Sequence, residues 1–329
     1  MTAAAGDVLF VELLGGFGDL LLALPAVHAL ALTGGRVHVA TFDPGGELLA
    51  RDPLVAAVST TSDHREGAPR AFVEGLLTSR RYDRAVTTTA YDGIPDLLRA
   101  HVPVVADALW RRPPPDELVD RRFLRLLAAD GLVRADLAHL PPRVALDPAE
   151  VAAGHALLGS RVPVLLLPDA GMAVKRWPHW PRLVARLDDL DVVTAPGPDP
   201  APAYGARLLP AQNLRGLAGL AAAVGERGGV AVGADTGPVR LAAAAGARTV
   251  GLFGPTLASR YGQRPEDGHL ALQGLSGCAV RRPTAITDQV CWWSGTCPLT
   301  SGPAACMHDI SVGDVEAAVR AALPGHLAA

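Results

Sequence analysis

The sequence predicts an α/β protein made of two domains, each built around a parallel sheet. The chain has 329 residues, about twice a common domain length. Short apolar runs bounded by Gly, Pro and Asp alternate with helical segments, which is typical of strands buried on both faces. This alternation occurs twice, on either side of the Pro-rich segment 140–148. We therefore expect two Rossmann-like domains, at 1–147 and 148–310, that face each other across a cleft and bind ligands beyond the carboxyl ends of their strands.

Individual elements follow from the same pattern. A strand at 8–11 leads through a Gly-rich turn at 15–18 into an apolar helix that is expected to begin at Asp19. The other predicted strands of the first half are 36–41, 84–88 and 101–105. In the second half we expect strands at 162–167, 191–194, 229–234 and 249–253, and helices at 180–187, 217–224 and 238–245.

Composition excludes several classes of function. The formal net charge is −3 and no basic run exceeds two residues, so the chain lacks the basic stripe that nucleic-acid binding needs. No apolar stretch reaches roughly 18 residues, so stable membrane insertion is not expected. The N-terminus has no basic start of the kind that secretory signals carry. We expect a cytoplasmic monomer.

The Gly-rich turn that ends in Asp19 is the first candidate site. Glycines let the backbone turn tightly and approach a ligand closely. Asp19 has two interpretations: an N-cap that holds the first amides of its helix, or a carboxylate at the cleft that acts as a base. The glycines do not spell GxGxxG, so a dinucleotide site is weakly supported.

Lys175 is the second candidate, because it is the only lysine in the chain. It follows the predicted strand 162–167 and lies shortly before a helix. In a sequence that otherwise uses arginine, a retained lysine favours a specific role over a solvated surface position. The functional interpretation is a point charge for a phosphate group.

The third candidate is the helix opening at Gly237. An ordinary capped helix is one interpretation; the other is an anion site made by the first amides and the helix dipole. Asp235 then requires a partner, such as a sugar hydroxyl or Lys175. The turn Gly254–Pro255–Thr256 after the strand at 249–253 is expected at the same sheet edge. The residues of this helix start are Asp235, Thr236, Gly237, Pro238 and Arg240.

All the cysteines lie in the last part of the chain, and three states remain open for them. Free thiols are favoured, a structural zinc is the second alternative and disulfides the third, because the CxxC spacing of zinc knuckles is absent. The four are Cys278, Cys291, Cys297 and Cys306.

In combination, four stretches resemble glycosyltransferase family 9, the ADP-heptose:lipopolysaccharide heptosyltransferases. They are 8–30, with the GD turn; 165–187, with Lys175; 230–256, with the sequences DTG and FGPT; and 291–319, the cysteine-containing tail. The resemblance implies a GT-B fold and an inverting, metal-independent glycosyltransferase. It also implies a final segment, 311–329, whose helix crosses back onto the N-terminal domain.

The resemblance further implies roles for individual residues. Asp19 matches the catalytic base, and Lys175 the catalytic lysine on the donor diphosphate. The donor, ADP-heptose by family resemblance, is expected against Gly18, Gly254, Pro255 and the residues from Asp235 to Arg240; the acceptor is expected near Gly16 and Phe17. No cofactor beyond this sugar-nucleotide substrate is expected, and the acceptor is a glycan or small molecule.

Three departures from the family pattern keep alternatives open. Arg240 stands where the family commonly has His, Glu12 stands where an Arg is usual, and 60–142 matches poorly. One alternative is a nucleotide-sugar epimerase or hydrolase on the same fold. The other is a non-catalytic protein that binds a sugar nucleotide. Consumption of donor without an acceptor would indicate the former, and binding without turnover the latter.

Overall fold

The computed structural model describes residues 6–196 and 204–324, which divide into two compact units. Unit 1 extends to Pro113 and includes Val119–Ala145. Unit 2 includes Pro114–Leu118 and continues from Leu146. The division after Ala145 lies close to the boundary at 147/148 that the Pro-rich segment predicts.

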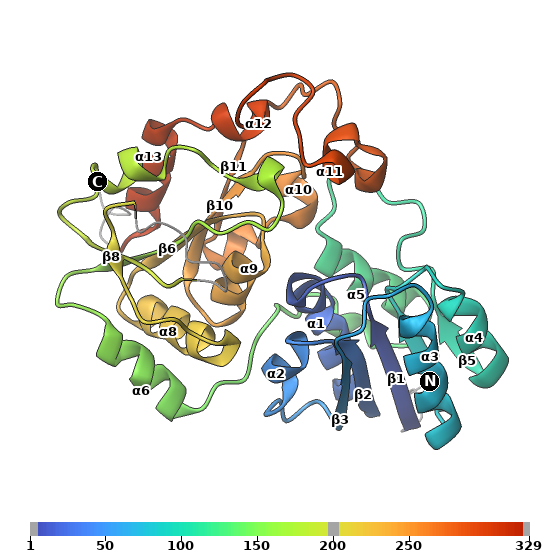
Figure 1. Cartoon of the computed structure of the whole chain (residues 1–329). Helices are drawn as coiled ribbons and strands as arrows, with labels where there is room; N and C mark the ends of the chain where they lie inside the picture. The colour runs from blue at the N-terminus through green and yellow to red at the C-terminus, as the bar shows by residue number, and fades with distance from the viewer. Residues whose placement is uncertain (1–5, 197–203, 325–329) are drawn as a thin grey trace. The chain divides into compact units, whose positions relative to one another are not determined.

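Unit 1 contains a five-stranded parallel sheet with the order β3-β2-β1-β4-β5 (Figure 1). The central strand β1 pairs with β2 on one side and with β4 on the other. The strands are β1 (Gly6–Glu12), β2 (Gly35–Phe42), β3 (Ala57–Thr61), β4 (Arg84–Thr87) and β5 (Val104–Ala106).

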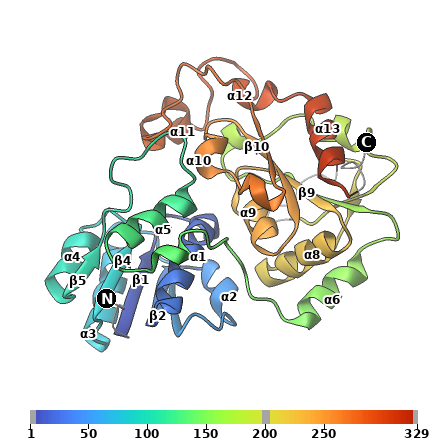
Figure 2. The same ribbon diagram turned by 180° about the vertical axis from the view of Figure 1, so that it is seen from behind.

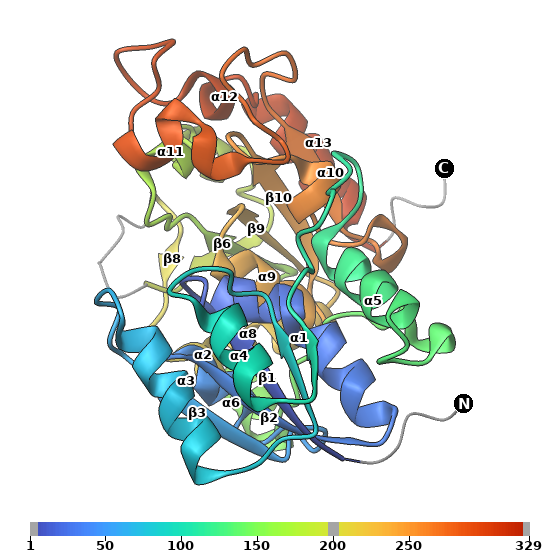
Figure 3. The ribbon, with the colours of Figure 1, turned by 90° about the vertical axis from the view of Figure 1, so that its right-hand side faces the viewer.

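Helices cover this sheet. Helix α1 packs on β1 and β2 and against α5, while α3 and α4 lie side by side (Figure 3). Residues 20–30 of α1 are all buried, and all of them except His28 are apolar. The helices are α1 (Phe17–Leu32), α2 (Gly45–Leu49), α3 (Ala68–Ser79), α4 (Ile94–His101) and α5 (Val119–Ala129).

Unit 2 contains a six-stranded parallel sheet with the order β11-β10-β9-β6-β7-β8. The strands are β6 (Pro163–Leu167), β7 (Asp191–Thr194), β8 (Arg207–Leu208), β9 (Val230–Ala234), β10 (Arg248–Phe253) and β11 (Leu270–Gln273). The helices are α6 (Pro148–Leu157), α7 (Trp180–Val184), α8 (Leu214–Glu226), α9 (Gly237–Ala244), α10 (Ala258–Tyr261), α11 (Val290–Ser294), α12 (Ala305–His308) and α13 (Val312–Ala322).

Both faces of the second sheet are buried, and successive residues of β6 show why its sequence is apolar throughout. Val164 and Leu166 join the core that contains Trp177 and Trp180. Leu165 and Leu167 point to the other face and join the core of α8 and α9. A strand that is covered on both faces has no polar side, as the sequence pattern indicates. Helices α6 and α8 pack together along this second face (Figure 2).

One expectation from the sequence is wrong in detail. The strand expected at 101–105 is shorter, because His101 ends α4 and β5 begins at Val104. In the described part of 311–329, α13 packs on β10, β11 and α7 of unit 2, and the crossing of this segment onto unit 1 stays a prediction. The physical reason for this packing is the apolar stripe of α13 at helical spacing, which completes the core of unit 2: Val312, Val315, Ala318, Val319 and Ala322.

Candidate functional site

Each sheet has a point at which the strand order reverses, and the polar residues predicted as functional follow the strands that meet there. In unit 2 this point lies between β6 and β9. Lys175 comes from the segment after β6, and Asp235 directly follows β9. In unit 1 the point lies between β1 and β4, and Asp19 follows β1. Ligands of open α/β sheets bind outside the carboxyl ends of strands at such points.

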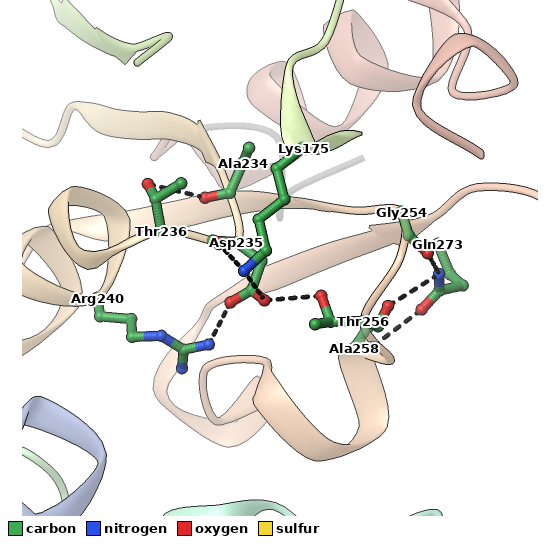
Figure 4. A network of polar contacts seen from close by, with 9 residues as sticks. All are labelled: Lys175, Ala234, Asp235, Thr236, Arg240, Gly254, Thr256, Ala258 and Gln273. Atoms are coloured by element: carbon green, nitrogen blue, oxygen red, sulfur yellow. Dashed lines mark hydrogen bonds and ion pairs between the residues drawn. The ribbon is translucent and has the colours of Figure 1, made fainter. Parts of the chain in front are cut away.

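Lys175 and Asp235 are in direct contact, although 60 residues separate them (Figure 4). The Lys175 ammonium donates to the Asp235 carbonyl at 2.8 Å and to the carboxylate Oδ2 at 3.1 Å. The Lys175 side chain, at the end of a short 3₁₀ turn, is 14% exposed. The surface-lysine interpretation is therefore wrong.

Two further groups bind the Asp235 carboxylate, which is 4% exposed. Arg240 donates to Oδ1, and the Thr256 hydroxyl donates to Oδ2 at 2.6 Å. Burial alone would raise the pKa of Asp235. The charges of Lys175 and Arg240, together with the Thr256 hydrogen bond, instead lower it to about 2. Asp235 is therefore an ionised carboxylate held between two cations.

Arg240 is not an open phosphate ligand here, because its guanidinium is buried against Asp235 and the ring of Tyr261. The ion pair with Asp235 gives the positive charge of Arg240 a structural partner, at a position where the family commonly has His. Arg240 would have to share or give up its ion pair with Asp235 in order to bind a phosphate. Lys175 is the more exposed of the two cations.

Helix α9 begins with backbone amides that no side chain caps. Thr236 occupies the N-cap position, but its hydroxyl donates to the Ala234 carbonyl and makes no cap bond. Gly237 and Pro238 form the first turn and are half-buried. Proline at this point has no amide to leave unsatisfied. The helix start thus keeps the positive end of its dipole beside Lys175 and Asp235.

Gly254 and Pro255 are buried behind this network rather than at its surface. A Cβ on Gly254 would lie 2.4 Å from the Met307 sulfur and 2.9 Å from Cys306 Sγ. The glycine is therefore explained by close packing against α12. The same turn supplies Thr256 to the carboxylate of Asp235.

In unit 1, Asp19 lies in the first turn of α1 and is half-buried. It is not the N-cap, because the helix begins at Phe17 and the cap position is Gly16, which is exposed. A Cβ on Gly16 would meet nothing within 4 Å. The turn before Asp19 is therefore open, and the capping interpretation of this aspartate is wrong.

Glu12, at the end of β1, is a buried carboxyl group beside Asp19. It is 1% exposed, and it accepts hydrogen bonds from the Leu14 amide at 3.0 Å and the Thr41 hydroxyl at 3.4 Å. Burial, and then the charge of Asp19, raise the pKa of Glu12 to about 8. The sequence singled Glu12 out as a departure, but only its burial beside another acid reveals this pKa.

The four cysteines line one small cavity next to the Lys175 network. Val174 and Pro255, the neighbours of Lys175 and Thr256, line the same cavity. All four thiols are free. Among the residues placed in the structure, no group of three or more His, Cys, Asp or Glu side chains has the arrangement of a metal site. The cavity links the cysteine tail to the strand ends of the second sheet.

One aromatic residue of the site was missed by the sequence analysis. The Lys175 ammonium lies 5.1 Å from the centroid of the Trp292 ring, within the range of a cation–π contact. Trp292 belongs to α11, inside the stretch 291–319 that the resemblance includes. The double tryptophan next to Cys291 was the available signal. Nothing local connects it with Lys175.

The comparison with protein families agrees with the resemblance found in the sequence. Residues 110–267, which contain Lys175, Asp235 and Arg240, match the family model for glycosyltransferase family 9 (heptosyltransferase). Over these residues, just under half of its length, the chain is similar to family 9 glycosyltransferases, as its motifs predict. A search of curated proteins returns no match.

Solved structures agree with the GT-B fold expected for this chain. E. coli ADP-heptose lps heptosyltransferase II matches with a TM-score of 0.67 and 18% identity, over 98% of this chain and 100% of that one. E. coli heptosyltransferase WaaC with ADP matches with a TM-score of 0.63 and 17% identity, over 96% of this chain and 99% of that one. At these identities the likeness shows the fold: two parallel α/β sheets.

A third similar structure contains a metal. The iron-containing dodecameric glycosyltransferase TibC from enterotoxigenic E. coli has a TM-score of 0.61 and 15% identity, over 98% of this chain and 80% of that one.

Within residues 6–196 and 204–324 of the present chain, no helix is long and apolar enough to cross a membrane.

Proposed function

We propose that this enzyme transfers a heptose from ADP-heptose to an acceptor hydroxyl with inversion and without a metal ion. The observation that supports the proposal best is the Lys175–Asp235 pair beside the start of α9, at the strand reversal of the second sheet. WaaC, a structure with the same fold, binds ADP. The nucleotide and sugar are carried over from such relatives as part of the proposal.

The donor diphosphate would lie against the first amides of α9, with Lys175 as its counter-charge. When the bond between the sugar and the diphosphate breaks, negative charge accumulates on the departing ADP. An ammonium group and a helix N-terminus stabilise that charge more strongly than the charge of the intact donor. Losing one such group typically costs about 3 kcal/mol of transition-state stabilisation, or about 10²-fold in rate.

Asp19 would accept the proton of the attacking hydroxyl. The acceptor oxygen attacks the anomeric carbon from the side opposite ADP, its proton passes to the Asp19 carboxylate, and ADP leaves with the electrons of the broken bond. A positioned base contributes roughly 10²–10⁴-fold. The open turn at Gly15 and Gly16, where added side-chain carbons would meet little, leaves room for an acceptor near Asp19.

Two variants separate these roles. Lys175→Met should weaken binding of ADP, measured by calorimetry, because it removes the counter-charge. Asp19→Asn should bind ADP as the wild type does but lose ADP release from ADP-heptose in the presence of an acceptor panel. A saturating donor, at about 100 times its dissociation constant, should also stabilise the wild type by about 2.7 kcal/mol.

The proposal has clear contrary outcomes. Wild-type turnover by Asp19→Asn would exclude the base role. Equal ADP affinity of Lys175→Met and the wild type would exclude the donor site. If a GDP, UDP or TDP sugar stabilised the protein more than ADP-heptose does, that sugar nucleotide would be the donor instead. Rapid consumption of ADP-heptose without an acceptor would indicate a hydrolase or epimerase.

A further inference from the structure

The ring of Trp292 lies next to the only lysine of the chain, from a segment 117 residues away in sequence. Its centroid is 5.1 Å from the Lys175 ammonium. Trp292 is half-buried, whereas the neighbouring Trp293 is 77% exposed and donates its indole N–H to the Thr287 carbonyl. The two adjacent tryptophans therefore have different environments, and only Trp292 is described in contact with the cation.

The segment that carries Trp292 is fixed to the same turn that supplies Thr256. Arg281 donates to the Gly254 carbonyl through two nitrogens, at 2.7 and 3.1 Å. Gln289, 2% exposed, accepts from the Arg282 amide at 2.6 Å. Cys291 is buried in the cavity that Val174 and Pro255 also line. The residues that precede Trp292 are thus fixed by hydrogen bonds and core packing, which anchors the segment that carries the indole.

The other contacts of Asp235 show why Lys175 needs such support. If the Lys175 ammonium turns toward a phosphate, Asp235 keeps Arg240 on Oδ1 and Thr256 on Oδ2. Lys175 can therefore leave the carboxylate without stranding a buried charge. A flexible four-carbon side chain with that freedom loses entropy when it binds a ligand. An aromatic face beside the ammonium restricts its position without taking the place of a hydrogen-bond acceptor such as a phosphate oxygen.

We propose that Trp292 is a positioning residue of the donor site, which holds the Lys175 ammonium through its ring face in the place where the donor diphosphate binds. The inference deepens the proposed function and rests on it. The ring acts through electrostatic attraction between the cation and the π face, which is strongest for tryptophan among the aromatic side chains. It makes no bond in the reaction and carries no proton.

The test measures ADP binding by calorimetry for substitutions at Trp292. Trp292→Leu keeps an apolar side chain but removes the π face, and should weaken ADP binding about three- to thirtyfold. Trp292→Phe keeps an aromatic ring and should lose less ADP affinity than Trp292→Leu. Trp293→Leu is the matched control, one residue away and without contact to Lys175 in the described network, and should bind ADP within twofold of the wild type.

A double-variant cycle assigns the effect to Lys175. In a Lys175→Met background, Trp292→Leu should cause no further loss of ADP affinity, because the cation is already absent. Full additivity would overturn the inference and indicate a purely structural role. If Lys175→Met itself leaves ADP affinity unchanged, the proposed function fails. If it weakens binding while Trp292→Leu does not, only the positioning role fails.

A second readout covers the case in which Trp292→Leu disturbs folding. Replacing the five tryptophans by mono-, di- and trifluorinated analogues weakens the negative ring face with little change in shape. ADP affinity should fall stepwise with fluorination in the wild type and stay constant in fluorinated Trp292→Phe. Affinity that is independent of fluorination in both proteins would overturn the inference.

Discussion

The ammonium of Lys175 donates to both the backbone carbonyl and the carboxylate of Asp235, at 2.8 and 3.1 Å. This double contact joins the segment after β6 to the first residue after β9, across the point where the strand order of the second sheet reverses. Because Arg240 shares the same carboxylate, the site already contains two cations and one anion before any donor arrives. Its net positive charge suits a diphosphate.

Asp235→Asn should destabilise the protein at neutral pH by about 3–5 kcal/mol, because it leaves Lys175 and Arg240 buried without their counter-charge. Urea unfolding at pH 7 measures this. Asp189→Asn is the control: that carboxylate is 54% exposed and pairs with Arg320 at the surface, so its loss should cost no more than about 1 kcal/mol.

The same carboxylate predicts a pH dependence. The folded-state pKa of Asp235 is about 2, below its ordinary value near 3.9. Its contribution to stability is therefore complete above about pH 4 and is lost as the pH falls through about 2. The difference in unfolding free energy between the wild type and Asp235→Asn should shrink over that window. If this difference in unfolding free energy stayed constant from pH 5 to pH 2, Asp235 would not be the ionised partner of Lys175 and Arg240.

Glu12 should have the opposite dependence, because its pKa is raised to about 8 by burial and by Asp19. Between about pH 4.5 and pH 8 the folded state holds a proton that the unfolded state has released. Stability therefore falls as the pH rises, by up to about 1.4 kcal/mol per pH unit from this group. Glu12→Gln should remove that part of the slope in urea unfolding series. If the unfolding free energies of the wild type and Glu12→Gln changed equally with pH, the raised pKa of Glu12 would be refuted.

Cys297 should be the thiol that alkylates before Cys291 and Cys306. Burial opposes ionisation of Cys297, but hydrogen bonds from the backbone of Ala305 and Leu299 lower its pKa. Burial raises the pKa of Cys306 to about 11. Since the thiolate is the nucleophile, iodoacetamide at pH 7.5 should label Cys297 before Cys306. Peptide mass spectrometry over time checks this, and equal rates would contradict it.

Gly254→Ala should lower the unfolding free energy by about 1–3 kcal/mol, because the new Cβ would lie 2.4 Å from the buried Met307 sulfur. The matched change Gly171→Ala, where a Cβ meets nothing within 4 Å, should stay within about 0.5 kcal/mol of the wild type. Equal melting temperatures for the two variants would show that α12 yields to the added methyl group.

Much of the fold follows from local sequence. The central residues of β1, β6, β9 and β10 are apolar because both faces of each sheet are covered, and Gly, Pro or Asp marks the turn that follows each of these runs. The short strand β5 and the start of α1 were misjudged by a few residues, since capping by Gly16 leaves no side-chain signal. These are errors of boundaries, not of element type.

The candidate site divides in the same way. The sequence alone determined that a unique lysine and an acidic residue each follow a buried strand, because strand length and turn chemistry are local properties. Only the tertiary structure decided that Lys175 binds Asp235, that Trp292 lies over the ammonium, that Glu12 is buried beside Asp19 and that α13 completes the core of unit 2. Strand order and long-range packing bring together residues far apart in the chain, and burial then sets their charge. None of these is encoded in the spacing along the sequence.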